Sequence, residues 1–591
     1  MSIPEKPCIL EQDSRCAKSI AHKEREDTME LDRRNFLKEA FATGAVAAAG
    51  AALTSCSPAS SDSGSDGNVD STTSGEAKHT WEVKPEPITD IAETKSYDIV
   101  IVGAGLAGIS AAESAARSGA KVTVIERSTG ISIRGVDVGN IGSNFHKSEG
   151  FDIDWHIPAR QLHTDSRQKT NYELISVWAS RSGEVFDYLE KLGEPISVSM
   201  THALSGTAKY DGWDQLDGQW RVYPDAVSFV RGDETYDVRG DGKTVNWTLG
   251  EMLYDSAVEN GAEFIFDTHA EQLVGDAESG ITGVIASTKD GKNIQYDGAK
   301  AVILATGDIG GNQEMIDVFA PIANRADANT YTPEGCNTGD GILMGCWAGA
   351  AIQKSTAAPM IHQFTADSLT LNLTSFIMCW LAVDSEGKRY GAEMPFEPML
   401  TNARMNTPGN VAWSLFDADY PTYVQKQQAT RYDRFMDGVE DVMADWEQKG
   451  TLVKANTIEE LAEKIGVPAD NLKATIERYN ELAANGEDID FGVPANFLAP
   501  VQTAPFYATK NVCSLLTIPF GLHVNAESQV LTEDDQVIKG LYAIGNVQGD
   551  FFGDDYQVHF PGVSHGRCVT FGELVGQAIA KDTVVSKLDF E

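Results

Sequence analysis

The stretch Tyr97–Ser128, YDIVIVGAGLAGISAAESAARSGAKVTVIERS, predicts a β-strand, a glycine turn, a helix and a second strand that ends in an acid. Gly103, Gly105 and Gly108 form G-x-G-x-x-G where the first strand passes into the helix. In order, these glycines allow a tight bend, the approach of a pyrophosphate to the backbone and helix N-terminus, and close packing of helix on strand. Glu126 follows at the distance where an acid binds ribose hydroxyls. We therefore predict a dinucleotide-binding unit, with an ordinary βαβ turn as the alternative.

Length and charge narrow the class of protein. A chain of 591 residues is too long for one core, which predicts two or three structural units. Hydrophobic residues make up 42% of the chain, so most of it is expected to be globular. The formal net charge of −40 makes nucleic acid an unexpected partner, because a phosphate backbone requires a basic surface. Solubility is the simplest role for this acidity.

Residues 1–56 have the pattern of an export signal. Residues 32–38, DRRNFLK, form a twin-arginine signature, and the apolar run that follows is too short to remain as a membrane span. Residues 53–56, LTSC, resemble a lipobox, in which Cys56 becomes the lipidated first residue. We expect export by the twin-arginine route to the cell surface or periplasm side, with a lipid at Cys56 as the only membrane attachment. A soluble protein with an alanine-rich helix is the alternative.

Residues 57–94 are predicted to be a disordered linker. The first part, SPASSDSGSDGNVDSTTSGEAKHT at 57–80, is rich in Ser, Gly and Asp and has no periodicity. The five cysteines after Cys56 are scattered, without a C-x-x-C pair, so neither a disulfide framework nor an iron–sulfur cluster, attached c-type haem or other metal site is expected. They are Cys336, Cys346, Cys379, Cys513 and Cys568.

Two later regions are predicted to return to the nucleotide-binding sheet. Residues 261–266 predict a strand, and residues 283–288 and 294–296 predict two more on either side of the turn Asp290-Gly291. Residues 301–304 then predict a buried strand. The last region, 540–580, combines a strand, the loop segment PGVSHG at 561–566 and a helix that ends near Ala580. The sheet is therefore expected to form from discontinuous pieces of chain.

The order of these motifs resembles the superfamily of FAD-binding fumarate reductases, flavocytochromes c and 3-ketosteroid dehydrogenases. The resemblance covers roughly residues 95–585 and rests on G-x-G-x-x-G with its acid, A-T-G-x-x-G-G-N at 305–312, T-G-D-G at 338–341 and G-L-Y-A-x-G at 540–545. The chain also looks like exported, haem-less reductases of anaerobic gut actinobacteria. The resemblance implies an α/β fold: a Rossmann-like FAD-binding domain in two parts, 95–355 and 518–591, with an inserted α+β cap domain at 356–517.

The resemblance also implies FAD as the cofactor. In this family the ADP part lies over the glycine turn with the acid on the ribose, and the C-terminal segments contact the flavin. The helix that starts near Ser564 would direct its positive end at the flavin N1/O2 edge and stabilise the reduced ring. The implied cofactor-binding residues are Gly103, Gly105, Ala107, Gly108, Glu126, Arg127, Ala270, Gly307, Asp340, Gly545, Asn546, Ser564 and His565.

The residues that bind and protonate fumarate in this family have no counterparts here. Fumarate-type members carry V-N-x-x-G-x-R-F-x-N-E and then an arginine proton donor, whereas residues 383–393 are VDSEGKRYGAE and Glu397 stands at the donor position. Leu516-Thr517 replace a paired histidine, and residues 554–562, DDYQVHFPG, lack the substrate-clamping arginine. A small dianion needs several cations, so fumarate is not the predicted substrate.

Three residues are predicted to be catalytic. Tyr556 and His559 lie in a loop that resembles the tyrosine-bearing loop of ketosteroid dehydrogenases, although the spacing from Tyr to Pro-Gly is longer here. A phenol whose pKa is adjusted by its surroundings can move a proton at carbon. Packing against FAD or the cap is the alternative role of Tyr556. Arg404 is predicted as a proton donor or carboxylate clamp, with a surface ion pair as the alternative.

We therefore expect an exported FAD-dependent oxidoreductase that reduces an activated C=C bond in an unsaturated small molecule, an enoate or enone. Family members transfer a hydride between flavin N5 and the substrate carbon. Electrons would come from a separate membrane-associated haem or flavin protein, because the chain has no haem-binding motif. Two alternatives remain: a 3-ketosteroid-type dehydrogenase, and a lipoprotein that carries flavin or binds a ligand without catalysis.

Overall fold

The computed structural model describes residues 79–590 except 136, 203–225, 233–242, 245, 330–331, 333–334, 366–377, 394–397, 428–431 and 558–559. The predicted export signal, the lipid site at Cys56 and most of the predicted linker lie outside the described residues. Within them, no helix is both long enough and apolar enough to cross a membrane.

The predicted linker, 57–94, extends too far toward the C-terminus. The 3-10 helix η1 (Thr80–Glu82) and strand β1 (Ile91–Val102) both begin before residue 95. Trp81 is buried, and its ring lies 5.1 Å from that of Phe319. Thr80 Oγ1 donates a hydrogen bond of 2.6 Å to Glu314. Residues 79–94 therefore have fixed contacts that their polar composition did not indicate.

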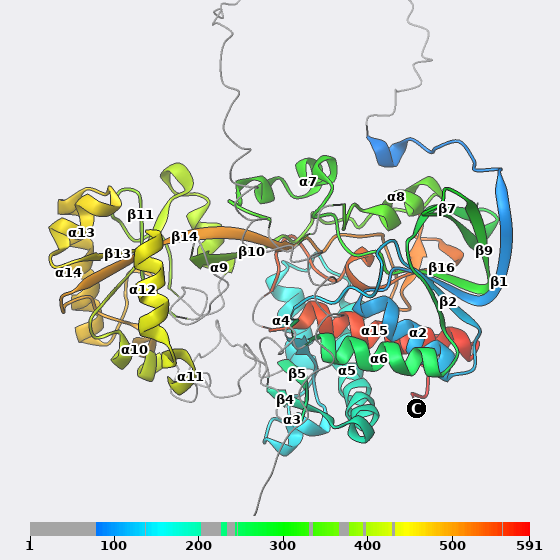
Figure 1. Cartoon of the computed structure of the whole chain (residues 1–591), viewed down its shortest axis with the longest axis horizontal. Helices are drawn as coiled ribbons and strands as arrows, with labels where there is room; N and C mark the ends of the chain where they lie inside the picture. Colours follow the sequence, from blue (N-terminus) through cyan, green and yellow to red (C-terminus); the bar gives the residue numbers. More distant parts are fainter. Residues whose placement is uncertain are drawn as a thin grey trace, which may run out of the picture. The chain divides into compact units, whose positions relative to one another are not determined.

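A mixed sheet of eight described strands forms the centre of the nucleotide-binding part (Figure 1). β1 lies in its middle, and Ile99, Val100 and Ile101 are fully buried because both faces of the sheet are covered. β1, β2, β6, β9 and β16 pair in parallel. The spatial order is β15 (Gln529–Leu531), β16 (Val537–Ala543), β9 (Asn293–Leu304), β1, β2 (Val122–Ile125) and β6 (Glu263–Ile265), with β8 (Gly280–Thr288) and β7 (Thr268–Asp276) joined to β9.

The predicted discontinuous sheet is observed, with differences in its strands, among them β15, which was not predicted. The strands predicted at 294–296 and 301–304 are one strand, β9, which pairs with both β8 and β1. β7 was not predicted from the sequence. A small sheet of β3 (Val138–Gly139), β5 (Ala226–Arg231) and β4 (Val198–His202) was also not predicted.

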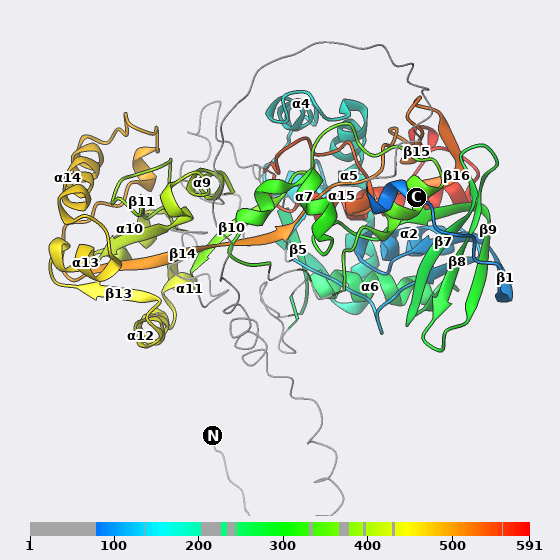
Figure 2. The same cartoon turned by 90° about the horizontal axis from the view of Figure 1, so that it is seen from above.

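Three helices, α2 (Leu106–Arg117), α15 (Val563–Ala580) and α6 (Asn246–Glu259), pack side by side against the sheet, as Figures 1 and 2 show. α15 approaches α2 closely, and Gly572 allows this because it has no Cβ. A Cβ at this position would lie only 2.5 Å from the Cβ of Ser110. The other helices of this part are α3 (Asn144–Ser148), α4 (His156–Asp165), α5 (Tyr172–Gly193), α7 (Gln313–Phe319) and α8 (Asp340–Trp347).

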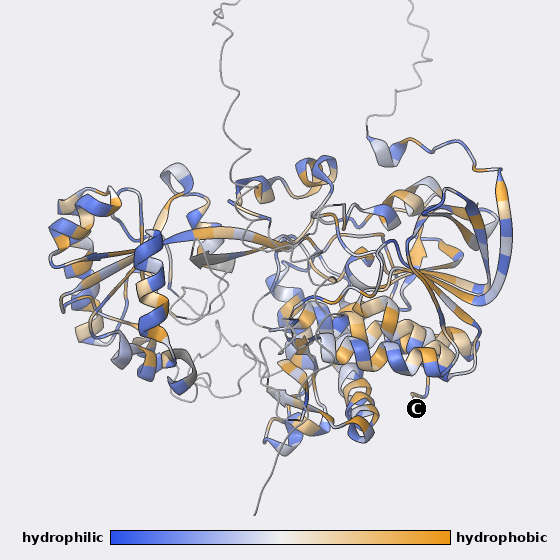
Figure 3. Ribbon diagram, viewed as in Figure 1, coloured by the Kyte–Doolittle hydropathy of each residue, from blue (hydrophilic) through white to orange (hydrophobic). Residues whose placement is uncertain are grey.

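The inserted segment forms an antiparallel sheet in the order β10-β14-β12-β11, with β13 also paired to β14. It has its own hydrophobic cluster between Met378 and Ala508, and Figure 3 shows hydrophobic residues along its strands. The predicted fold class, a Rossmann-like α/β domain with an inserted α+β cap, is confirmed. The cap elements are β10 (Met360–Thr365), β11 (Leu381–Asp384), α9 (Pro398–Arg404), β12 (Ala412–Asp417), α10 (Tyr420–Gln427), α11 (Tyr432–Met436), α12 (Val439–Lys449), β13 (Leu452–Ala455), α13 (Ile458–Ile465), α14 (Ala469–Asn485) and β14 (Phe506–Thr517).

Candidate functional site

A cavity opens beyond the carboxyl end of β1, where the glycine turn leads into α2. It encloses about 1060 Å³, part of it open to solvent. Open parallel sheets bind their ligands in this position. All the residues predicted to bind the cofactor line the cavity except Gly108. The structure thus brings together segments that lie more than 400 residues apart in the chain, from Gly103 to Cys568.

The three glycines of the turn have different surroundings. Gly103 has a φ of +108°, and a Cβ there would lie 2.4 Å from the carbonyl oxygen of Ala305. A Cβ on Gly108 would lie 1.9 Å from the carbonyl oxygen of Gly103. A Cβ on Gly105 would contact only the carbonyl oxygen of Ser132, at 3.8 Å. Gly103 and Gly108 are therefore needed for the close backbone packing of the turn, whereas the missing side chain of Gly105 leaves space for a ligand.

The N-terminus of α2 faces this space. Its N-cap is Gly105, and no side chain caps the helix. The first N–H groups of a helix have no partner within the helix and carry the positive end of its dipole. Leu106 and Ala107, in this first turn, line the cavity. The arrangement suits a pyrophosphate.

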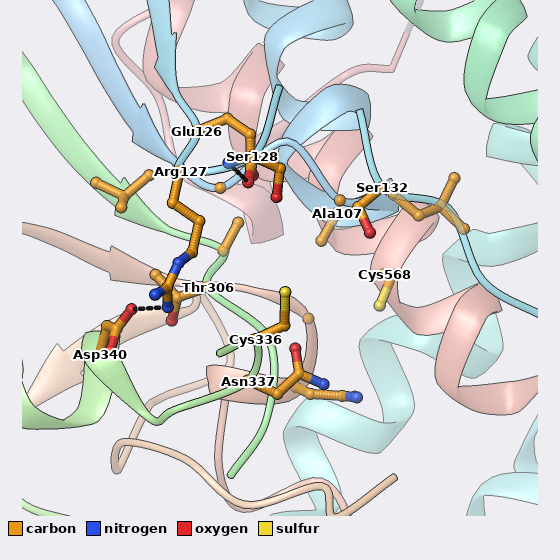
Figure 4. A pocket seen from close by; sticks show the side chains of 18 of the residues that line it. Ala107, Glu126, Arg127, Ser128, Ser132, Thr306, Cys336, Asn337, Asp340 and Cys568 are labelled. Atoms are coloured by element: carbon orange, nitrogen blue, oxygen red, sulfur yellow. Dashed lines mark hydrogen bonds and ion pairs between the residues drawn. The ribbon is translucent and has the colours of Figure 1, made fainter. Parts of the chain in front are cut away.

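Glu126, directly after β2, lies beside the same turn. Its Oε2 accepts a hydrogen bond of 2.7 Å from the Ala104 N–H, and its Oε1 accepts one of 2.7 Å from the Ser128 N–H. Figure 4 shows the carboxylate and Ser128 at the cavity wall. Two backbone donors fix the carboxylate, and its remaining lone pairs can accept hydrogen bonds from ribose hydroxyls.

A charged cluster around Asp340 forms another part of the wall. The Arg127 guanidinium lies 3.1 Å from Asp340 Oδ2, as Figure 4 shows, and His269 Nε2 lies 3.2 Å from the same oxygen. The hydrogen bond to Asp340 raises the pKa of His269 to about 8. Burial opposes ionisation of Asp340, but its hydrogen bonds with His269 and Thr338 outweigh this effect and lower its pKa. The cluster is therefore ionised at neutral pH.

Asn546 is the centre of a polar network at the other end of the cavity. It lies in the 3-10 helix η8 (Gly545–Val547). Its Oδ1 accepts hydrogen bonds from Ser564 Oγ at 3.0 Å and from the Arg567 guanidinium at 2.8 Å. Its Nδ2 donates to Thr517 Oγ1 at 2.9 Å and to Asp308 Oδ2 at 3.3 Å. Because Oδ1 faces two donors, the orientation of the amide is defined.

His565, in the first turn of α15, is neutral at physiological pH. Its Nδ1 lies 2.9 Å from the carbonyl oxygen of Asp137, which can only accept, so Nδ1 carries the proton. Burial lowers the pKa of the imidazole to about 4. Nε2 is then a hydrogen-bond acceptor in the cavity wall.

Two buried polar atoms test whether the wall fits a cofactor. Thr306 Oγ1 and Asn337 Nδ2 have no hydrogen-bond partner in the described structure, and both residues line the cavity. Buried polar groups normally have partners, so these two atoms call for a polar ligand. Figure 4 shows Asn337 next to Cys336 in the wall, and Thr306 beside the end of the Arg127 side chain. Together with the open space at Gly105, they fit a large ligand such as FAD.

Tyr556 lies behind the cavity wall rather than in it. Its hydroxyl oxygen accepts a hydrogen bond of 3.3 Å from the N–H of Ser564, in the first turn of α15. Its ring stacks on Phe552, with 4.9 Å between ring centres. Burial raises the pKa of the phenol strongly, although the Ser564 N–H and Arg567 act in the opposite direction. Tyr556 is therefore a protonated phenol next to a residue that lines the cavity.

Arg404 is not brought to the cavity. It is the last residue of α9, it is buried, and its Nη1 lies 2.9 Å from Asp327 Oδ2. Its Nη2 donates to the carbonyl oxygen of Asn410 at 2.7 Å. It differs from both expectations, because the guanidinium is buried, although its partner Asp327 is 38% exposed. The other two positions discussed from the sequence, His559 and Glu397, lie outside the described residues.

The sequence analysis missed several residues of the wall. Asn337 directly precedes the T-G-D-G motif, and Cys568 lies one helical turn after Ser564, so both could have been found from their neighbours. Ser132 and Arg134 lie in a loop without a recognisable pattern. Among the described residues, no cluster of His, Cys, Asp or Glu could hold a metal ion.

Comparison with known proteins agrees with this geometry. Residues 98–554 match the family described as FAD binding domain. A probable fumarate reductase of Shewanella frigidimarina is 25% identical over 536 residues, covering 85% of this chain and 82% of that protein. The vinyl phenol reductase of Lactiplantibacillus plantarum is 27% identical over 522 residues, covering 83% and 98%. The solved structure of 3-ketosteroid-Δ4-(5α)-dehydrogenase from Rhodococcus jostii RHA1, in complex with 4-androstene-3,17-dione, has a TM-score of 0.64 at 21% identity, covering 84% and 100%.

Proposed function

The chain belongs to the FAD binding domain family and is an FAD-dependent oxidoreductase, and we propose that it reduces an activated C=C bond of a small unsaturated molecule. The observation that carries the proposal is the pair of helix N-termini, α2 and α15, at the two ends of one cavity. When bound, FAD supplies hydride transfer. The glycine turn and Glu126 would hold its ADP part, and Asn546, Ser564 and His565 would hold its ring.

The environment of Tyr556 supports reduction over dehydrogenation. The phenol is protonated at neutral pH, and burial keeps it so by raising its pKa; in this form it can give a proton to carbon but cannot take one. Because its oxygen accepts from the Ser564 N–H, its own proton remains available to a further acceptor. After donation, the N-terminus of α15 and the Arg567 cation would stabilise the phenolate.

The cations of the wall favour a substrate that is not a dicarboxylate. Both lining arginines within the described chain are paired: Arg127 with Asp340 at 3.1 Å, and Arg134 with Asp308 at 3.4 Å. The rings of the C-terminal loop, among them Phe551, Phe552 and Phe560, are buried in the hydrophobic core and do not line the cavity, so the proposal of a planar, mainly apolar substrate rests on the paired arginines. The similarity to a vinyl phenol reductase supports the same substrate class.

An anaerobic assay with reduced viologen and mass-spectrometric product detection tests this function. The panel contains a vinyl phenol, an aromatic enoate, a steroid enone and fumarate. We expect consumption of viologen with an aromatic enoate, vinyl phenol or enone, and none with fumarate. Activity only with dye acceptors and a saturated ketone would identify a dehydrogenase. Bound FAD with no turnover in either direction would identify a flavin carrier.

We also propose that the enzyme acts outside the cytoplasmic membrane, anchored by a lipid at Cys56, with electrons from a separate haem or flavin protein. The twin-arginine signature at 32–38 and the lipobox-like segment at 53–56 support the location. Cys56→Ala should release the protein from membranes and abolish labelling by fatty acid. Substitution of Arg33 and Arg34 by lysine should retain the precursor in the cytoplasm. Unchanged fractionation of both variants would contradict the proposal.

A further inference from the structure

Arg567 is a buried cation without a carboxylate partner. It lies in the second turn of α15 and is fully buried. Its Nη2 donates to Asn546 Oδ1 at 2.8 Å, and its Nη1 donates to the carbonyl oxygen of Gln548 at 3.2 Å. Its Nε has no hydrogen-bond partner among the residues that the structure describes. In the described part of the chain, no aspartate or glutamate forms an ion pair with it.

Two other arginines of the described chain, whose side chains are largely buried, are neutralised. Arg404 is paired with Asp327 at 2.9 Å, and Arg389 is paired with Asp488 at 2.8 Å and also with Glu393. Burial of a charge is costly unless a counter-charge or hydrogen bonds compensate for the loss of water. Arg567 has only neutral acceptors, so it keeps a net positive charge in the interior.

Aromatic rings provide part of the compensation. The guanidinium carbon lies 5.1 Å from the centre of the Phe551 ring and 4.9 Å from that of Phe552. Such cation–π contacts are attractive but leave the charge in place. Both rings lie in the loop after η8, on the side of Tyr556. Asn546 accepts its hydrogen bond from Nη2, at the edge of the guanidinium.

The field of this charge reaches the cavity. Asn546, which accepts from the guanidinium, lines the cavity, and so do Ser564 and Cys568 on the same helix. The N-terminus of α15 points its positive end in the same direction. In the low dielectric of a buried site, a unit charge acts over several ångströms with little screening.

We propose that Arg567 raises the reduction potential of the bound flavin, because its unneutralised charge behind Asn546 stabilises the negative charge that the ring gains on reduction. The inference rests on the proposed flavin function. Charge near the flavin ring is one of the means by which a protein sets the potential of this cofactor. Arg567 is thus a positioning residue, which also fixes the orientation of the Asn546 amide in the cavity wall. It does not itself contact the reacting atoms.

A purely structural role makes a different prediction. If Arg567 only joins α15 to the loop after η8, Arg567→Gln and Arg567→Lys should both lower the melting temperature and leave the potential unchanged. If its charge acts on the flavin, the two variants should differ in potential. Gln keeps a donor for Asn546 and loses the charge, whereas Lys keeps the charge and loses the planar fork.

The test is an equilibrium titration of the FAD-loaded protein against a reference dye, followed by absorbance. For Arg567→Gln, we expect the ratio of reduced to oxidised flavin at a fixed potential to fall about tenfold, which for a two-electron couple is about 30 mV. Arg567→Lys should stay within about threefold of the wild-type ratio, about 15 mV by the same conversion. Arg181→Gln is the matched control, because Arg181 donates to two backbone carbonyl groups outside the cavity.

Wild-type potential in FAD-loaded Arg567→Gln would overturn the inference and leave the proposed function standing. Equal shifts in the Gln and Lys variants would also overturn it. If Arg567→Gln does not fold, Arg567→Lys and Arg567→Met provide the same contrast. Purified wild-type protein that takes up no flavin would instead contradict the proposed function itself.

Discussion

The two ends of the cavity are built in different ways. At the end formed by the glycine turn, the ligand space is bounded by backbone: the N–H groups of α2 and a carboxylate held by two N–H groups. At the end formed by α15, it is bounded by the side chains of Asn546, Ser564 and His565, and Asn546 is itself held by Asp308 and Thr517, which do not line the cavity. The backbone end suits a constant group such as a pyrophosphate. The side-chain end can change with the reaction that the protein catalyses.

The contrast predicts which measurement each substitution should affect. Changes at the backbone end should weaken FAD binding and leave the chemistry of bound FAD intact. Changes at the side-chain end should alter turnover or potential in protein that still holds FAD. If a substitution at the backbone end changes the turnover of FAD-loaded protein, or one at the side-chain end weakens FAD binding, the two ends act as one unit.

The largest expected effect is that of Tyr556→Phe at the side-chain end. The variant loses the proposed proton donor, so turnover should fall by about 10²–10⁴. FAD content should remain that of the wild type, because the ring lies behind Ser564 rather than in the wall. Steady-state rates and the flavin spectrum measure the two quantities. Normal turnover in a yellow variant would remove Tyr556 from the mechanism.

Asp308→Asn should have the next largest effect, on stability. Asp308 is fully buried, and its Oδ2 accepts from Thr517 Oγ1 and from Asn546 Nδ2 at 3.3 Å. An amide NH₂ in place of that oxygen would face the Asn546 donor, so the free energy of unfolding should fall by about 1–3 kcal/mol. Urea denaturation measures it. Thr517→Val removes the donor to Asp308 and the acceptor of Asn546 Nδ2 but brings no two donors face to face, so it should cost less; the reverse order would contradict this account of the network.

Gly105→Ala tests the backbone end alone. A Cβ there meets no atom closer than 3.8 Å, and Gly105 has a φ of −80°, so the apoprotein should fold as the wild type does. The methyl group would occupy the ligand space, and we expect FAD affinity to fall at least about tenfold, equivalent to about 1.4 kcal/mol. Fluorescence titration of apoprotein measures the affinity. Gly130→Ala, at a position open on all sides, is the control and should bind FAD normally.

The same contrast explains what could be predicted from the sequence. The turn, α2, β2 and Glu126 follow each other within 30 residues, and their spacing alone indicates the binding of a dinucleotide. The network around Asn546 depends on contacts between residues more than 200 positions apart, such as Asp308 with Thr517 and Asn546. No local pattern indicates such contacts. For this reason Arg404 and Tyr556 could be named from the sequence, but their positions relative to the cavity could not.

Glu573→Gln tests whether the contact between α15 and α2, which join the two ends of the cavity, affects stability alone or turnover as well. Glu573 on α15 lies beside Glu113 on α2, and its Oε2 is 3.0 Å from the Arg117 guanidinium. Burial, and next to it the charge of Glu113, raises the pKa of Glu573 well above its ordinary value. The stability that this group contributes is therefore complete below its unfolded pKa and is lost as pH rises toward the folded value.

The variant should consequently gain stability relative to the wild type between pH 5 and pH 8, by about 1 kcal/mol. Urea denaturation at the two pH values measures the gain, with turnover as the second quantity. Since Glu573 does not line the cavity, turnover should not change. A parallel loss of turnover would show that α2 and α15 couple the two ends of the cavity. If the stability of the variant depends on pH as that of the wild type does, the group that takes up the proton is not Glu573.

His269→Gln should have the smallest effect, because it removes a charge from the backbone end that solvent partly screens. The pKa of His269 is raised to about 8 by Asp340, so its contribution to stability is complete below about pH 6.5 and is lost as pH rises through about 8. The side chain is 37% exposed, and screening reduces the contribution to less than about 1 kcal/mol. Wild-type FAD affinity should weaken by about threefold or less from pH 7 to pH 9, and the variant should show no such change. Arg127 remains paired with the same Asp340 oxygen in the variant, so a loss of FAD at pH 7 would mean that His269 holds the ligand directly rather than through the charge of this cluster.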